Sequence, residues 1–156
     1  KNAAKEIKAH NPDALIAIST YQTVASLIQN LNSQGSYPQV MTISFTGTKS
    51  LIKELPRHAS FGIGVTQVVP FPWDLRNPIV RDYQHDLRQV DSDAEFDFVS
   101  LEGYLIARKL VSALRKASPV INRSSLREAL LEENDGLISG GVEVDLVFLG
   151  TDPWQP

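Results

Sequence analysis

The sequence lacks several features that would have assigned it to a functional class. It contains no cysteine in 156 residues, which excludes disulfides, thiolate nucleophiles and cysteine-ligated zinc or iron–sulfur sites. Its longest apolar runs, near 14–18 and 142–149, are far shorter than the ~20 residues of a membrane-spanning helix. The 15 Lys and Arg are outnumbered by 18 Asp and Glu, and the sequence contains no basic run. Nucleic acid is therefore not an expected partner.

The composition that remains is that of a globular protein. Hydrophobic residues make up 42% of the chain and charged residues 21%, which is unlike a disordered or fibrous protein. The length suits one domain with a core, or fragments of two lobes. The chain begins at Lys1 within a helical pattern, with no initiator methionine or apolar leader. We therefore expect a C-terminal piece of a longer protein, for which a missing leader says nothing about export.

The first 70 residues alternate between strand and helix patterns. Apolar runs of strand length occur at 14–18, 40–45 and 61–69, and helical patterns at 24–35 and 51–55 separate them. Continuous apolar strands are typical of a parallel sheet that is buried on both faces. Connections of this length favour right-handed crossovers. The sequence therefore predicts an α/β unit built on a parallel sheet.

Helical patterns dominate the rest of the chain. A proline-bounded aromatic segment at 70–74 indicates a connection of defined shape. A helix is predicted from 78, a long one over 95–117, and another after a capping box at 125–128 that runs to about 133. The alternating pattern at 142–148 predicts a partly exposed strand.

No catalytic or metal-binding fingerprint is present. Segment 46–50 lacks the glycines of a phosphate-binding loop. Gly62-Ile63-Gly64 lacks the third glycine of a dinucleotide-binding turn, and its place inside a predicted strand indicates close packing instead. The three histidines show no metal-ligand spacing with acids, and no Gly-x-Ser-x-Gly motif occurs. We expect no catalytic residue, no metal and no cofactor.

The strongest binding candidates follow the predicted strands. In open parallel sheets, ligands bind beyond the carboxyl ends of the strands. Those ends carry hydroxyl and aromatic side chains, which suit a small polar ligand better than acid–base catalysis. They are Ser19, Thr20 and Tyr21 after the first strand, and Ser44, Phe45 and Thr46 after the second. The alternative is that Ser19, Thr20 and Thr46 only cap the helices that follow.

A further candidate lies in the long helix, where Glu102 is followed by Gly103 and Tyr104. Glycine inside a helix costs about 1 kcal/mol relative to alanine, so a close approach of another group near Gly103 is expected to compensate. Glu102 is therefore a candidate ligand contact. The alternative is that it only complements the positive end of the helix dipole.

Several segments carry a family resemblance through their order and spacing. They are Asn11-Pro12-Asp13, 37–51, 65–72, 78–83, 98–104 and 125–130. In this order they resemble the type I periplasmic-binding proteins, specifically the branched-chain amino-acid and amide receptors of ABC importers. The resemblance covers nearly the whole chain, to about residue 145.

The resemblance implies a ligand held between two α/β lobes. Residues 1–70 would form part of the second, Rossmann-like lobe, and 71–76 the hinge crossing. Residues 77–135 would be helices of the first lobe, and 136–156 a returning strand and tail. Most of the first lobe's sheet would then precede Lys1, so the long helix would expose an apolar face. Self-association of the fragment is a further expectation.

The resemblance also implies roles for individual residues. The family's aromatic after the first strand falls at Tyr21, its polar ligand contacts fall at Ser44 to Thr46, and an aromatic beside the cleft falls at Phe98. Phe71, in the hinge segment, completes the expected contacts. Amino-acid receptors of this kind often place an acid after the second strand, and none stands here. Glu102 or the missing lobe would have to supply any countercharge.

The implied function is capture without chemistry. An amino acid, amide or similar small polar ligand would be bound outside the cytoplasm, in the periplasm or its equivalent, and delivered to an ABC permease. The alternative is the ligand-sensing domain of a receptor or transcriptional regulator with the same fold. An upstream helix-turn-helix would favour a regulator, and a secretory or lipoprotein leader the transport receptor. An α/β enzyme is a third alternative, for which the sequence offers no catalytic set.

Overall fold

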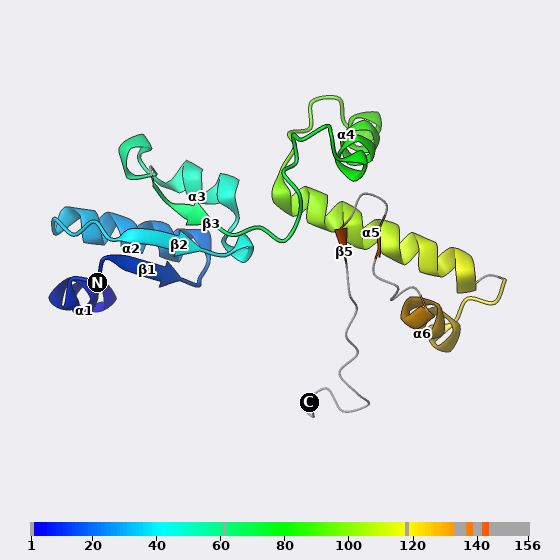
Figure 1. The fold of residues 1–156 in the computed structure, drawn as a ribbon, viewed down its shortest axis with the longest axis horizontal. Coiled ribbons are helices and arrows are strands. Elements are labelled where there is room, and N and C mark those ends of the chain that lie inside the picture. The colour runs from blue at the N-terminus through cyan, green and yellow to red at the C-terminus, as the bar shows by residue number, and fades with distance from the viewer. Residues whose placement is uncertain (1, 61, 118, 133–136, 139–141, 144–156) are drawn as a thin grey trace. The chain divides into compact units, whose positions relative to one another are not determined.

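The computed structural model describes residues 2–60, 62–117, 119–132, 137–138 and 142–143. The chain forms two compact units (Figure 1). The first, here called the sheet unit, is Lys1–Val68 with Asp97–Val99; the second, the helical unit, is Val69–Phe96 with Ser100–Pro156. Each is described by itself below, and the assignment of residues to lobes and a hinge stays a prediction.

The sheet unit alternates strands with helices. In chain order it contains α1 (Asn2–His10), β1 (Ala14–Ala17), α2 (Tyr21–Ser33), β2 (Gln39–Thr42), the 3-10 helix η1 (Ser44–Thr46), α3 (Thr48–Glu54), the 3-10 helix η2 (Arg57–Ala59) and β3 (Gly64–Val65). The strands pair in the order β1-β2-β3, and both pairs are parallel. The predicted α/β class with a parallel sheet is therefore confirmed.

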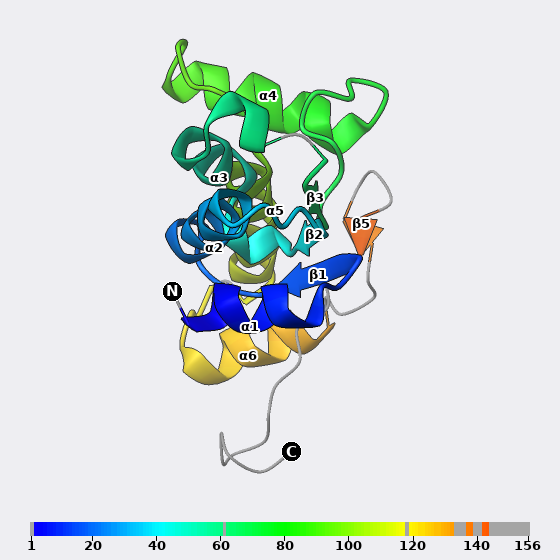
Figure 2. The same cartoon turned by 90° about the vertical axis from the view of Figure 1, so that its left-hand side faces the viewer.

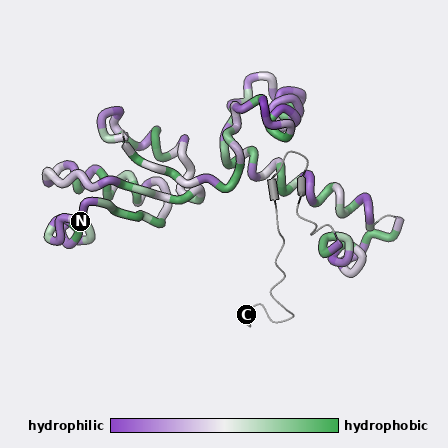
Figure 3. The backbone as a smooth tube through the Cα atoms, in the orientation of Figure 1, coloured by the Kyte–Doolittle hydropathy of each residue, from purple (hydrophilic) through white to green (hydrophobic). Residues whose placement is uncertain are grey.

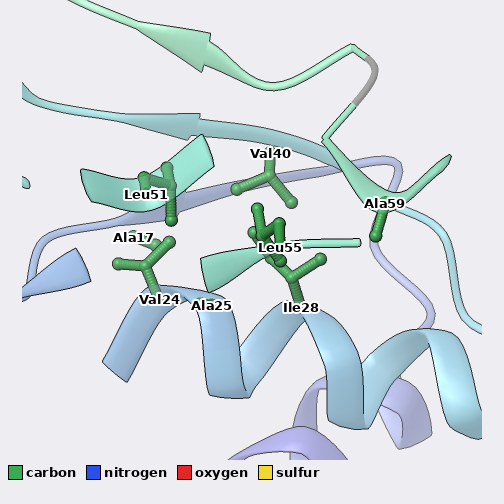
Figure 4. Close-up of a cluster of buried hydrophobic side chains, with 8 residues drawn as sticks. All are labelled: Ala17, Val24, Ala25, Ile28, Val40, Leu51, Leu55 and Ala59. Atoms are coloured by element: carbon green, nitrogen blue, oxygen red, sulfur yellow. The ribbon is translucent and has the colours of Figure 1, made fainter. Parts of the chain in front are cut away.

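One face of this sheet packs against α2 and α3. Successive side chains of a strand point to opposite faces, so the buried residues Ala17 of β1 and Val40 of β2 lie on one face. They pack with Val24 and Ile28 of α2 and with Leu51 of α3 (Figure 4). Both helices lie on the same side of the strands (Figure 2). This face is the hydrophobic core of the sheet unit.

The opposite face of the sheet is open in the described part of the chain. Ile16 is 72% exposed and Met41 37%, so the expected burial on both faces holds for one face only. Gly64 pairs with Met41, and a Cβ at Gly64 would lie 2.1 Å from the Met41 sulfur. Packing at Gly64 is thus close, but the neighbour is the Met41 side chain and not the backbone that was predicted.

All three strands end earlier than their patterns predict, β1 by a single residue, at Ala17. β2 ends at Thr42, and the chain turns into η1, where the Thr46 N–H donates to the Ile43 carbonyl at 3.0 Å. β3 covers only 64–65, and one further ladder bond, from the Thr66 N–H to the Thr42 carbonyl, extends it. Since β2 has already turned away, the β-branched residues after Thr66 have no strand to pair with.

The helical unit contains α4 (Pro78–Val90), most of α5 (Phe98–Ala117), α6 (Arg123–Glu132), and the short antiparallel pair β4 (Leu137–Ile138) and β5 (Val142–Glu143). The three helices are confirmed within a few residues of their predicted bounds. Residue 133, the expected helix end, and 144–148 of the expected strand lie outside the described residues.

Asparagines begin two of these helices. The Asn77 side chain accepts from the Ile79 N–H at 3.0 Å, with proline in the first turn. At α6 the Asn122 side chain accepts from the Ser125 N–H, and the Ser125 hydroxyl accepts from the Asn122 N–H, both at 3.0 Å. The predicted capping box at 125–128 is therefore wrong by three residues, because asparagine supplies the reciprocal bond.

The core of the helical unit lies between α4 and the first half of α5. Ile79, Val80 and Tyr83 of α4 pack against Leu101 and Leu105 of α5, and all five are buried. These positions recur at three and four residues, which places them on one side of each helix.

Other apolar positions of α5 are exposed. Ile106, Leu110 and Val111 are 56%, 43% and 45% exposed, and hydrophobic and hydrophilic stretches alternate along the helix (Figure 3). A Cβ at Gly103 would meet nothing within 4 Å, so the expected close approach there is wrong. None of the described helices is both long and apolar enough to cross a membrane.

A polar network joins the outer sides of α4 and α5. The Tyr104 hydroxyl donates to an Asp86 carboxylate oxygen at 2.7 Å, and the Arg108 guanidinium donates to Asp82 at 2.7 Å and to the Tyr104 oxygen at 3.2 Å. Partial burial, followed by the hydrogen bond to Asp86, raises the pKa of Tyr104 above its ordinary value. The network therefore holds Tyr104 in its protonated form.

Leu51→Ala tests the core of the sheet unit. Leu51 is 2% exposed, so its truncation should lower the free energy of unfolding by about 2–5 kcal/mol through lost burial and a residual cavity. The neighbouring Ile52, 55% exposed, is the matched control, and Ile52→Ala should cost about 0.5 kcal/mol or less. Urea unfolding followed by circular dichroism measures both. Equal losses would contradict this packing.

Tyr104→Phe tests the network in the helical unit. Loss of the hydrogen bonds should cost about 0.5–1.5 kcal/mol at neutral pH. Because folding raises the pKa of Tyr104, its contribution is fully present below the unfolded pKa of about 10 and is lost as the pH rises through the folded value. Urea unfolding at pH 7 and above pH 10 measures this. The free energy of unfolding should fall less between the two pH values in the variant than in the parent. Tyr37→Phe, at a 75% exposed tyrosine, should match the parent at both pH values.

Candidate functional site

The carboxyl ends of β1, β2 and β3 meet at one edge of the sheet. Parallel pairing requires this, since paired strands run in the same direction. Residues 18–21, 43–46 and 66–68 follow the three strands there, and we call these segments the carboxyl edge. The strands and the helices that follow them can be traced in Figure 1.

Two buried threonines hold the first two segments of the carboxyl edge together. Thr42 and Thr46 are 1% and 2% exposed. The Thr42 hydroxyl donates to the Ala17 carbonyl at 2.7 Å and the Thr46 hydroxyl to the Ser19 carbonyl at 3.0 Å, and the two hydroxyl oxygens lie 2.5 Å apart. Thr46 therefore has a structural task in this sheet, and its predicted ligand contact stays a prediction.

The residues after β1 divide between packing and exposure. Thr20 is the N-cap residue of α2, but its hydroxyl pairs with the Thr23 hydroxyl at 3.2 Å and makes no capping bond. The alternative that Thr20 merely caps the helix is therefore wrong. Tyr21 is half-buried against the core of the sheet unit, and Ser19, two residues earlier, is also half-buried.

An exposed apolar residue follows each of the three strands. Ile18 is 68% exposed, Phe45 69% and Val68 64%. Phe45 was among the predicted site residues, whereas Ile18 was taken as part of the first strand. Val68 was missed because the third strand was expected to continue to 69. The rule that ligands bind at strand ends would have found both, had the strand ends been known.

The carboxyl edge has no charged side chain. No Asp, Glu, Lys or Arg occurs at 18–23, 43–48 or 66–69, and the first that follows is Lys49, in the first turn of α3. The amide of Gln67 donates to the Thr48 hydroxyl at 2.8 Å. No group of three or more metal-ligating side chains occurs among the described residues. The edge thus offers hydroxyls, amides and apolar surface.

Six of the nine predicted site residues lie at the carboxyl edge: Ser19, Thr20, Tyr21, Ser44, Phe45 and Thr46. Phe98 groups with the sheet unit as the first residue of α5. Phe71 and Glu102 belong to the helical unit. Phe71 is 57% exposed, with its ring centroid 5.0 Å from that of Trp73, and Glu102 is half-buried. The roles of these three stay predictions.

A pocket of about 810 Å³ lies at the opposite end of the sheet unit. Asp13 and Gln39, at the amino ends of β1 and β2, line it together with Tyr37 and His58. None of the nine predicted residues does. The carboxyl edge is an open edge of one unit. We select it as the candidate site because of the side chains that it presents, not because it forms a deep pocket.

Thr46→Val tests the threonine tie. The isosteric change removes the donor to the Ser19 carbonyl, so the free energy of unfolding should fall by about 1–3 kcal/mol. Ser44→Ala is the matched control, because the half-buried Ser44 hydroxyl makes no hydrogen bond within the described residues, and it should change stability by about 0.5 kcal/mol or less. Urea unfolding of both variants measures these changes. If Thr46→Val leaves the free energy of unfolding unchanged, the Thr46 hydrogen bond does not stabilise the edge.

Comparison with known structures agrees with this fold. The chain is similar to a possible leucine/isoleucine/valine-binding protein from Rhodopirellula baltica SH 1, at 36% identity and a TM-score of 0.79, over 86% of this chain and 36% of that one. It is also similar to a substrate-binding periplasmic protein from Ralstonia solanacearum, at 28% identity and a TM-score of 0.76, over 85% and 38% of the two chains.

A fatty acid ABC transporter substrate-binding protein from Thermomonospora curvata shares the fold, at 21% identity and a TM-score of 0.75, over 92% of this chain and 38% of that one. The chain thus spans less than half the length of these structures. No curated protein matches the sequence. The family model described as periplasmic binding protein matches residues 1–145. The chain belongs to the periplasmic binding protein family, with the type I periplasmic-binding fold.

Proposed function

We propose that the chain belongs to the extracytoplasmic solute-binding component of an ABC importer. The carboxyl edge of the sheet unit carries this proposal. It sits where ligands bind in open parallel sheets, and it presents neutral hydroxyls beside exposed apolar side chains, Phe45 among them. These groups can recognise a small molecule and are poorly suited to acid–base or nucleophilic catalysis.

The solute class of this proposal is an amino acid, an amide or a similar small polar molecule. The similarity to a possible leucine/isoleucine/valine-binding protein supports an amino acid or a relative of one. The structure from Thermomonospora curvata is named for fatty acids, so proteins of this fold accept solutes of different chemistry. The residues of the edge, rather than the fold, must therefore decide among these classes.

Binding would proceed by closure of two lobes on the solute. A ligand stabilises the closed state only through contacts that the open state lacks. The carboxyl edge would supply one wall of the cleft, held in place by the bonds of Thr42 and Thr46. Phe71, Phe98 and Glu102 are the proposed contacts elsewhere. The bound protein would then be recognised by a membrane permease.

Thermal denaturation of the full-length protein, with and without solutes, tests the proposal. A panel should include branched-chain and aromatic amino acids, small amides and short carboxylic acids. A solute at a hundred times its Kd stabilises the native state by about 2.7 kcal/mol, which corresponds to a rise in Tm of several degrees. Nucleotides and sugars serve as negative controls. If no compound of the three classes raises the Tm, the solute-binding proposal is wrong.

A further inference from the structure

We infer that the carboxyl edge binds the apolar body of its solute and does not pair with an ammonium group. Among the proposed solutes this favours apolar-bodied amides and carboxylic acids over zwitterionic amino acids, whose ammonium group would need a partner elsewhere, such as Glu102. This inference rests on the proposed function, because it names the solute class of the same edge.

The apolar surface of the edge is the first observation. Ile18, Phe45 and Val68 are each about two-thirds exposed and follow three neighbouring strands. Adjacent strands lie ~4.8 Å apart, so one small molecule can span neighbouring strand ends. Burial of such surface by a ligand is favourable in proportion to its apolar area.

The backbone at Phe45 is held by hydrogen bonds before any ligand arrives. It lies in η1, between Ser44, whose carbonyl accepts from the Gly47 N–H at 3.0 Å, and the buried Thr46. The Thr46 hydroxyl is bonded to the Ser19 carbonyl. An aromatic side chain on a backbone already held in this way costs less conformational entropy when it binds a ligand.

The edge also has no carboxylate of its own to pair with a positive charge. An ammonium group must replace its lost hydration with carboxylates or free carbonyls, and no acid occurs at 18–23, 43–48 or 66–69. Six backbone carbonyls here already accept one hydrogen bond from the chain, which leaves each with a single lone pair: Ala17, Ser19, Thr20, Thr42, Ile43 and Ser44. The first charged residue that follows is the cation Lys49.

Neutral hydroxyls remain for the polar part of the solute. Ser19 and Ser44 are half-buried, and their hydroxyls make no hydrogen bond within the described part of the chain. A hydroxyl can donate to an amide carbonyl or to a carboxylate. Uncharged amides and carboxylic acids with an apolar body therefore share the chemistry that this edge recognises.

Matched solutes test the inference by isothermal titration calorimetry on the protein as its gene encodes it. Leucine, 4-methylpentanoic acid and 4-methylpentanamide share one branched apolar body, and only leucine carries the ammonium group. The acid or the amide should bind at least as tightly as leucine. Shortening the acid to propanoic acid removes three carbon groups and should weaken binding about 50-fold.

Substitutions at Phe45 provide a second measurement. Phe45→Ala should weaken binding of the apolar-bodied solute at least about tenfold, a difference of about 1.4 kcal/mol, while Phe45→Leu should stay within about threefold. Tyr37→Ala is the control, since Tyr37 is a comparably exposed aromatic, at 75%, that lines the pocket at the opposite end of the sheet. It should leave the Kd unchanged. Thermal melts of each variant verify folding.

The outcomes separate the two proposals. If leucine binds at least tenfold more tightly than both analogues, the ammonium group is recognised and the inference is overturned, while solute binding stands. The inference also fails if Phe45→Ala and Tyr37→Ala have equal effects on the Kd. If neither the solutes named here nor any compound of the wider panel binds, both the proposed function and this inference are wrong.

Discussion

The sheet unit depends on the parallel pairing of β1 with β2 and on the hydrogen bonds of two threonines at the end of this pair. The pairing brings the residues that follow both strands to one edge. Thr42 and Thr46 then satisfy the carbonyls of Ala17 and Ser19. Without these bonds the buried acceptors would lose their partners, and the loop that carries Phe45 would lose its anchor. The end of the sheet and the candidate site therefore depend on the same hydrogen bonds.

This arrangement separates stability from recognition within a short stretch of chain. On one face Val40 packs against α2 and α3, whereas Phe45, five residues later, is 69% exposed at the edge. Chemistry at the edge can therefore vary without disturbing the core. The same fold occurs in structures named for branched-chain amino acids and for fatty acids. In this chain the strand ends carry no charged side chain and expose Ile18, Phe45 and Val68.

Periodicity in the sequence was sufficient to predict the class, the parallel sheet and the main helices. It failed where partners at long range decide the outcome. The run at 61–69 reads as one strand, but only Gly64 and Val65 pair, because β2 turns away after Thr42. Six of the nine predicted site residues follow strands, and the rule for strand ends pointed to them. Val68 was missed because the third strand was predicted to be too long. The bond from Thr46 to the Ser19 carbonyl was missed because it is a tertiary contact, which the local sequence does not reveal.

We propose that the carboxyl edge, rather than the pocket at the amino end of the sheet, receives the solute. Hydrogen–deuterium exchange of the encoded protein with and without a binding solute tests it most directly. We expect slower exchange at 18–21, 43–46 and 66–68, and unchanged exchange around Tyr37 and His58, which line the pocket. Protection confined to the pocket residues would contradict the account.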